Sequence, residues 1–195
     1  MILEVNKLRK EVSSGESKLV ILDDVSFNLH EGQSLAITGP SGSGKSTLLG
    51  LLAGLDTATS GEIYLNGEAL HELDEEQRAL LRKEKVGFVF QSFELLPSLT
   101  ALENVMLPSE LKAEDEPEER AKYFLDRVGL NERKHHYPNQ LSGGEQQRVA
   151  IARAFACSAK ILFADEPTGN LDPKNGEIVS DLLFEVNSET DNALV

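Results

Sequence analysis

A nine-residue segment, Gly39 to Thr47, constrains the fold of this chain more than any other. It reads Gly-Pro-Ser-Gly-Ser-Gly-Lys-Ser-Thr, and it lies between short apolar runs at residues 35–38 and 46–53. The first run is predicted to be a buried strand and the second a helix. In that setting the loop amides and the positive end of the helix dipole face the same anion. The sequence therefore predicts a phosphate-binding loop, and a structural glycine-rich turn is the plainer alternative.

The side chains of this loop suit a nucleotide with a divalent cation. Lys45 can reach the outer phosphates, and the Ser46 hydroxyl can hold magnesium. We predict that the whole segment binds the nucleotide, through Gly39, Pro40, Ser41, Gly42, Ser43, Gly44, Lys45, Ser46 and Thr47.

Two acidic residues follow an apolar run at Ile161 to Ala164. This pattern predicts a buried strand with Asp165 and Glu166 at its carboxyl end, where open α/β sheets bind ligands. Asp165 is predicted to hold magnesium, and Glu166 to polarise an attacking water as general base. A plain strand terminus is the alternative reading of the same residues.

A third segment, Leu141 to Gln146, is predicted to open a helix that runs to Cys157. Ser142 and Glu145 have the spacing of a capping box. A capping box alone does not explain Gly143 and Gly144 in the first turn, where glycine costs up to about 1 kcal/mol relative to alanine. Exposed amides at a capped helix start indicate a second anion site, formed by Ser142, Gly143, Gly144 and Glu145 and serving a nucleotide held by another subunit.

Taken together, these segments resemble the nucleotide-binding domain of ABC transporters, and the resemblance covers essentially the whole chain. Residues 39–47 resemble the Walker A loop, Gln91 the Q-loop glutamine and residues 141–146 the signature motif. Residues 161–166 resemble the Walker B strand and residues 169–172 the D-loop. The segments 86–93, 141–148 and 163–172 are similar to the lipoprotein-release and macrolide-export branch, which includes the YbbA-like proteins.

The resemblance implies an α/β fold: a P-loop NTPase (RecA-like) core with an N-terminal antiparallel β subdomain and an inserted helical subdomain. The chain would form a single domain, 1–195, with residues 1–90 and 158–195 in the core and 91–157 in the helical signature subdomain. Its implied cofactors are ATP and Mg²⁺. Glu166, Gln91 and Lys45 would be catalytic, while Ser46, Gln91 and Asp165 would lie at the metal. Two copies would close around two ATP molecules and drive a separate membrane permease.

The sequence departs from the family pattern at two places. The aromatic residue that stacks on adenine in this branch would align near Val12, which cannot stack. The switch histidine follows a strand that begins near Ala193, and the sequence ends at Val195. We therefore expect a carboxyl-terminally truncated chain with impaired hydrolysis.

Composition limits the partners. A chain of 195 residues, 40% of them hydrophobic, can bury one substantial core. A net charge of −14 argues against a broad nucleic-acid surface. No apolar stretch reaches the roughly 20 residues of a membrane span, and the first residues show no signal-peptide pattern. We expect a cytoplasmic protein that does not insert into the membrane and is peripheral on the inner membrane through the permease.

Several other elements follow from capping signals. We predict helices that begin after Asp74 and Thr100 and at Pro117 and Pro173, and short strands at residues 3–7, 26–29, 34–38, 61–65 and 86–90. The loop after Gln91 carries Phe93, Leu95, Leu96 and Leu99, which we interpret as the permease-docking surface.

Other functions share part of this pattern. A catalytically weak scaffold that signals to a membrane partner, or a soluble non-transport ABC ATPase, would keep the same motifs. A nucleotide kinase is disfavoured because its chemistry has no use for residues 141–146. Lipoprotein, macrolide and peptide export fit equally, because the cargo contacts the permease and not this subunit.

Overall fold

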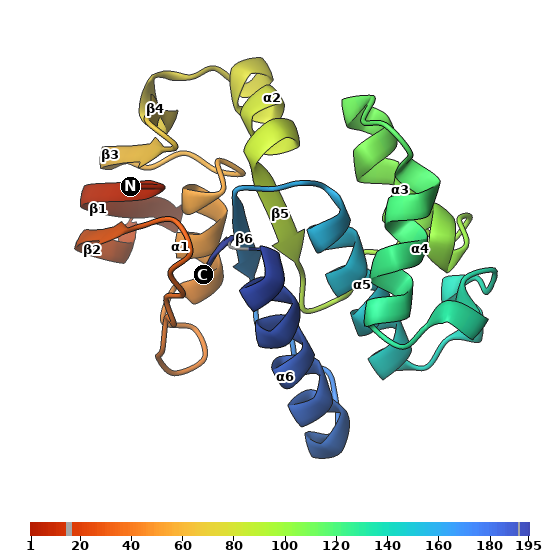
Figure 1. Ribbon diagram of the computed structural model, residues 1–195. Coiled ribbons are helices and arrows are strands. Elements are labelled where there is room, and N and C mark those ends of the chain that lie inside the picture. Colours follow the sequence, from red (N-terminus) through yellow and green to blue (C-terminus); the bar gives the residue numbers. More distant parts are fainter. Residues whose placement is uncertain (15–16, 191) are drawn as a thin grey trace.

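The computed structural model describes residues 1–14, 17–190 and 192–195. Its strands form two sheets, an antiparallel one in the order β2-β1-β3-β4 and a parallel one in the order β5-β6-β7. Figure 1 shows the antiparallel strands at one end of the molecule, β5 and β6 in the middle, and the helices α3 and α4 at the other end. The strands are β1 (Leu3–Ser14), β2 (Ser17–Leu29), β3 (Ser60–Leu65), β4 (Glu68–Ala69), β5 (Val86–Val89), β6 (Ile161–Ala164) and β7 (Ala193–Leu194).

The helices begin where the capping signals predict. Capping boxes are formed by Asp74 with Gln77, Thr100 with Glu103 and Ser142 with Glu145. Each box satisfies amides that a helix start leaves unpaired. The helices are α1 (Lys45–Leu52), α2 (Glu75–Lys85), α3 (Ala101–Lys112), α4 (Pro117–Arg127), α5 (Gly143–Ala156) and α6 (Pro173–Thr190), with short 3-10 turns at Leu70–Glu72, Asn131–Arg133 and Pro138–Gln140.

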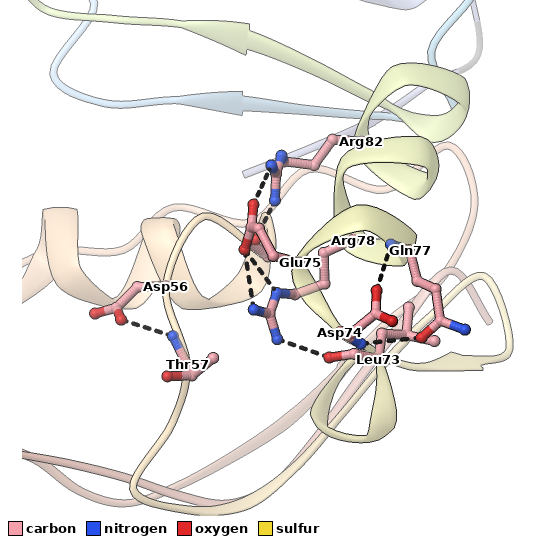
Figure 2. Close-up of polar contacts among 9 residues, drawn as sticks. Asp56, Thr57, Leu73, Asp74, Glu75, Gln77, Arg78 and Arg82 are labelled. Carbon is pink, nitrogen blue, oxygen red and sulfur yellow. Dashed lines mark hydrogen bonds and ion pairs between the residues drawn. The ribbon is translucent and has the colours of Figure 1, made fainter.

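Helix α2 is tied to the segment after α1 by a network of arginines (Figure 2). Glu75 accepts hydrogen bonds from Arg78 at 2.9 Å and from Arg82 at 2.8 Å. Arg78 also donates to the carbonyl of Leu73 at 2.8 Å, and Arg82 donates to the carbonyl of Gly54. These contacts fix α2 against the end of the helix that follows the glycine-rich loop.

The core has two apolar clusters that meet at β6. Leu162 belongs to the cluster formed with α3, α4, α5 and α6. Ile161 and Phe163 belong to the cluster formed with α1 and the antiparallel strands. Since successive side chains of a strand point to opposite faces, β6 is buried on both sides, as its continuous apolar run predicts. Val89 pairs with Ala164, so β5 and β6 end at the same edge of the sheet, and residues 90–91 and 165–166 follow there.

The predicted buried strand at residues 34–38 is wrong. Ser34 forms only an isolated bridge with Leu194, and residues 35–38 are half-buried or exposed. The amide of Leu35 donates to the carbonyl of Leu194 at 2.8 Å. In the described residues, residues 36–38 pair with no strand, and a segment without a ladder of hydrogen bonds is not a strand.

Candidate nucleotide site

The glycine-rich loop joins residues 34–38 to α1. Gly42 and Gly44 have positive φ angles of 79° and 91°. Gly44 is the N-cap residue of α1 and has no side chain with which to cap the first amides. A Cβ at this position would lie 3.0 Å from the Cγ2 of Ile21 and 3.2 Å from its carbonyl oxygen, so close packing against β2 also requires glycine. The helix start thus offers its amides and its dipole to an anion.

The Lys45 side chain turns back over the loop. Its Nζ donates to the carbonyl oxygens of Gly39 at 3.1 Å and Pro40 at 3.2 Å. The same atom lies 3.3 Å from Oε1 of Glu166, which comes from the end of β6. The Glu166 side chain is 44% exposed, so water can reach its carboxylate. Two residues that are 121 positions apart in the sequence therefore meet across the mouth of the loop.

A second contact joins the same two segments. The hydroxyl of Ser46 donates to Oδ1 of Asp165 at 3.0 Å. The amide of Asp165 donates to the carbonyl of Val89 at 3.0 Å, which fixes the carboxylate at the end of the parallel sheet. A hydroxyl and a carboxylate oxygen are the hard ligands that magnesium takes, with phosphates and waters supplying the rest. The pair therefore fits a magnesium ion, and in the described residues no cluster of three acidic, histidine or cysteine side chains competes with it.

A cavity of about 390 Å³ opens beside these residues. Lys45, Asp165 and Glu166 are its charged lining residues, and Leu35, Leu49 and Phe184 are among its apolar lining. Of the predicted catalytic and metal-binding residues, Lys45, Asp165 and Glu166 line this cavity. Ser46 reaches it through its hydrogen bond to Asp165, and Gln91 does not line it.

Gln91 lies beyond the end of β5, and its contacts are with the D-loop segment 169–172. The side chain of Asn170 donates to the carbonyl of Gln91 at 2.9 Å, and the Gln91 amide reaches Oδ1 of Asn170 at 3.4 Å. A Cβ at Gly169 would lie 2.8 Å from Nε2 of Gln91, so a larger residue there would push the Gln91 side chain away from this position. The structure therefore places the Gln91 side chain on the D-loop segment.

The turn after Gln91 is held from α5. Phe93 and Glu94 have positive φ angles of 64° and 47°. The guanidinium of Arg153 donates to the carbonyl of Phe93 at 2.9 Å and to that of Glu94 at 2.5 Å. Burial lowers the pKa of Arg153. A desolvated cation and two left-handed residues each cost free energy, so this turn keeps its conformation only because the surrounding structure holds it.

The start of α5 carries the predicted second anion site. The Ser142 hydroxyl and amide both donate to Oε2 of Glu145 at 2.8 Å, and Arg133 donates to Oε1 of Glu145 at 3.2 Å. The hydrogen bonds from the Ser142 amide and then from its hydroxyl, followed by the contact with Arg133, lower the pKa of Glu145. The glutamate is therefore ionised and partly neutralised by Arg133.

The two glycines of this helix start differ. Gly143 is half-buried, and a Cβ there would meet its nearest atoms, in Leu171 and Phe93, at 3.8 Å. Gly144 is buried, and a Cβ would lie 3.1 Å from Oδ1 of Asn175 in the same chain. Gly144 therefore has a packing reason within its own chain, which the interpretation as a bare amide for another subunit missed.

The sequence-based prediction gave no site role to two residues beside the site, although one of them, Asn170, belongs to the segment 169–172 that resembles the D-loop. Asn170 holds Gln91, and Gln147 of α5 donates to the carbonyl of Pro167 at 2.6 Å. Gln147 lies at helical spacing from the buried residues Gly144, Ile151 and Ala154. A polar side chain on the buried face of a helix was the available signal. Asn170 gave no such signal, because it lies in a polar turn.

Comparisons with known proteins agree on one family. The model of the family described as ABC transporter matches residues 22–169. The uncharacterized ABC transporter ATP-binding protein YbbA of Escherichia coli K12 is 55% identical over the whole chain, which spans 86% of that protein. The lipoprotein-releasing system ATP-binding protein LolD of Treponema denticola is 48% identical over the whole chain, which spans 87% of it.

The fold has close structural relatives. A solved dimeric structure of a post-hydrolysis state of the ATP-binding cassette MJ0796, bound to ADP and Pi, has a TM-score of 0.90. It is 42% identical, and the match covers all of this chain and 86% of that one. The predicted fold class is confirmed. None of the helices in the described parts of the chain has the length and apolarity needed to cross a membrane. The chain belongs to the ABC transporter family and is an ATP-binding subunit with ATPase activity.

Proposed function

We propose that this subunit binds ATP and Mg²⁺ at residues 39–47 and that two copies close around two ATP molecules. The observation that carries the proposal is the pairing of adjacent loop residues with adjacent acids: Lys45 with Glu166, and Ser46 with Asp165. These two contacts in register support a phosphate-binding role for Lys45, a general-base role for Glu166 and a metal-binding role for the oxygens of Ser46 and Asp165.

The second copy supplies the other face of each nucleotide. In the described residues, no hydrogen bond or ion pair joins residues 141–146 to residues 39–47, although both segments are built for phosphate. Ser142 is exposed, so its hydroxyl can exchange its hydrogen bond to Glu145 for one to the γ-phosphate bound by a partner, beside the neighbouring Gly143 amide. The dimeric structure of MJ0796 supports this arrangement as a related precedent.

Each residue has a defined part in hydrolysis. Lys45 exchanges the carbonyls of Gly39 and Pro40 for phosphate oxygens. Ser46 and Asp165 would hold Mg²⁺, which would supply neutralisation of the phosphate charge. Glu166 orients water and accepts its proton as the water attacks the γ-phosphorus. Gln91 leaves its contact with Asn170 and turns toward the γ-phosphate and the metal site. Loss of the γ-phosphate removes the charge that held both faces, and the dimer opens.

The test is ATP-dependent association of the Glu166→Gln protein, measured by light scattering. Glutamine keeps the size of the side chain but cannot accept the proton, so ATP should hold the variant as a dimer and phosphate release should stop. Glu68→Gln, on the exposed strand β4, is the matched control and should behave like the unchanged protein. Continued phosphate release by Glu166→Gln would remove Glu166 from the role of base.

We also propose that an amphipathic helix of a membrane permease docks beside the turn that follows Gln91, and that this contact holds the subunit at the cytoplasmic face of the inner membrane. A cleft of about 310 Å³ lies there, with an apolar lining of Val86, Phe88, Phe90, Leu107, Pro108 and Leu111. Leu111 in this lining is 61% exposed, and Leu96 in the turn after Gln91 is 44% exposed. An apolar cleft and exposed leucines fit the apolar face of a helix.

Phe93 is half-buried near Gly143, so Leu96 and Leu111 probe this surface better. The double variant Leu96→Asp and Leu111→Asp should lose co-purification with the permease and keep ATP-dependent association. Leu19→Asp, at an exposed leucine of β2, is the control. Retained co-purification of the double variant would place the permease elsewhere. We propose that the permease exports a lipoprotein, a macrolide or a peptide. The relative from Treponema denticola is named for a lipoprotein-releasing system.

A further inference from the structure

The backbone of Glu166 has an unusual conformation. Its φ angle is 45°, in the left-handed region. The next residue is Pro167, and the ring of a proline drives the preceding residue toward extended conformations. A left-handed glutamate before a proline therefore costs free energy, and such a residue persists only where its surroundings hold it.

Hydrogen bonds hold the backbone on both sides of Glu166. Before it, the Asp165 amide donates to the carbonyl of Val89 at 3.0 Å. After it, the Gly169 amide donates to the carbonyl of Glu166 at 2.9 Å. The carbonyl of Pro167 accepts from Nε2 of Gln147 at 2.6 Å. The last of these is the only one of the three that comes from a side chain, and it reaches the turn from helix α5.

Gln147 is an expensive way to fill its position. Its side chain is 0% exposed, and its Oε1 is buried without a hydrogen-bond partner in the described structure. An apolar residue of the same length would fill the space without an unpaired acceptor. Packing alone therefore does not explain an amide at this place, whereas the bond to Pro167 does.

We propose that Gln147 is a positioning residue for ATP hydrolysis: by holding the Pro167 carbonyl, it keeps the Glu166 carboxylate at the mouth of the loop, beside Lys45. This inference rests on the proposed role of Glu166 as general base. It also assigns α5 a double task. The first turn of the helix carries Ser142 toward the partner's nucleotide, and its second turn holds the glutamate that acts on the chain's own nucleotide.

Gln147→Met tests the proposal, because methionine keeps the length and burial and removes the donor. We expect kcat for ATP to fall about tenfold to a hundredfold, while KM changes less than about twofold, because residues 39–47 still bind the nucleotide. The thermal unfolding midpoint should stay close to that of the unchanged protein, because the unpaired Oε1 is removed together with the donor.

Asn187→Leu is the matched control. Asn187 is a second buried amide with an unpaired oxygen, and its Nδ2 donates to a backbone carbonyl, that of Asn192, at 3.2 Å. It lies near the end of α6, away from the turn at Glu166, so kcat should be unchanged. A fall in kcat that tracks the loss of stability in both variants would make Gln147 merely structural and overturn the proposal.

Gln147→Glu gives a reading that does not depend on the fold of the methionine variant. A protonated glutamate can donate to the Pro167 carbonyl, and an ionised one cannot. Burial raises the pKa of such a carboxyl, so the ratio of the variant's kcat to that of the unchanged protein should be higher at about pH 6 than at about pH 8.5. A ratio that does not change with pH in the folded variant would count against the proposed role of the hydrogen bond from Gln147 to Pro167.

Glu166→Gln, measured in parallel, separates the two failures. Loss of turnover in Glu166→Gln with full kcat in Gln147→Met would overturn the positioning role of Gln147 and leave Glu166 as the general base. Full turnover in Glu166→Gln would overturn the general-base role of Glu166, and the positioning role of Gln147 with it.

Discussion

At the residue scale, the adjacent acids Asp165 and Glu166 have different surroundings. Asp165 directly follows β6 and its amide still bonds to the Val89 carbonyl of β5, and its carboxylate accepts from the Ser46 hydroxyl. Glu166 turns into the left-handed region, and its carboxylate reaches Lys45. One change of backbone direction therefore separates a carboxylate suited to a metal from one suited to a water molecule.

Magnesium dependence should report on the first of these carboxylates. Asp165→Asn and Ser46→Ala each remove an oxygen ligand or its partner, so the Mg²⁺ concentration for half-maximal ATP-dependent association should rise about tenfold or more. Light scattering over a magnesium titration measures this. Ser188→Ala, which removes a hydroxyl of α6 bonded to the Glu185 carbonyl, is the control. An unchanged titration in both site variants would mean that the metal is held by other residues.

The residues of the loop and the two acids could be predicted from sequence because each motif is continuous. Gly39 to Thr47 is one turn between a connection and a helix, and Asp165 and Glu166 directly follow an apolar run. Gln147 and Asn170 were not assigned roles, because their partners lie 20 and 79 positions away. Such contacts depend on how α5 and the D-loop segment pack, which no local pattern encodes.

At the element scale, local chemistry decides where helices begin. The three capping boxes were predicted because both members lie within four residues of each other, and the backbone amides they satisfy exist wherever a helix starts. Residues 34–38 show the opposite case. Their composition suits a strand, but a strand forms only beside a partner, and β7 offers two residues. Strand extent is therefore a property of the neighbour as well as of the segment.

The capping boxes allow structure and function to be separated. Asp74→Ala, Thr100→Ala and Ser142→Ala should each lower the free energy of unfolding by about 1 kcal/mol, because each removes the same kind of cap. Only Ser142→Ala should also weaken ATP-dependent association, because only this hydroxyl is proposed to meet a phosphate. Denaturant unfolding and light scattering measure the two effects. Equal association in all three variants would leave Ser142 a cap and no more.

At the scale of the whole molecule, the stability of the fold depends on carboxylates that the folded protein holds in their ionised form. The Thr100 amide lowers the pKa of Glu103, and Arg82 with Arg78 lowers the pKa of Glu75. The Ser142 amide lowers the pKa of Glu145 in the same way. All three groups prefer the charge more strongly in the folded than in the unfolded protein.

Acid should therefore destabilise the fold through these groups. Each has a folded pKa below its ordinary value of 4.5, so its contribution is present above that pH and is lost as the pH falls through the lowered value. The free energy of unfolding should decrease between about pH 5 and about pH 3, as measured by urea titration. Glu103→Gln, which keeps a capping side chain without the charge, should make the decrease shallower. An equally steep decrease in this variant would show that other groups control it.

The contact of Arg153 with the turn after Gln91 has a mechanical consequence. Arg153 is near the far end of α5, about 16 Å along the helix axis from Ser142. The guanidinium holds two backbone carbonyls of the turn, and a packed helix is stiff. A displacement of the turn is therefore transmitted along α5 to the start of this helix. Under the proposed docking, a force applied to the loop by the permease is delivered to the start of α5, where Ser142 is proposed to meet the neighbouring copy's γ-phosphate.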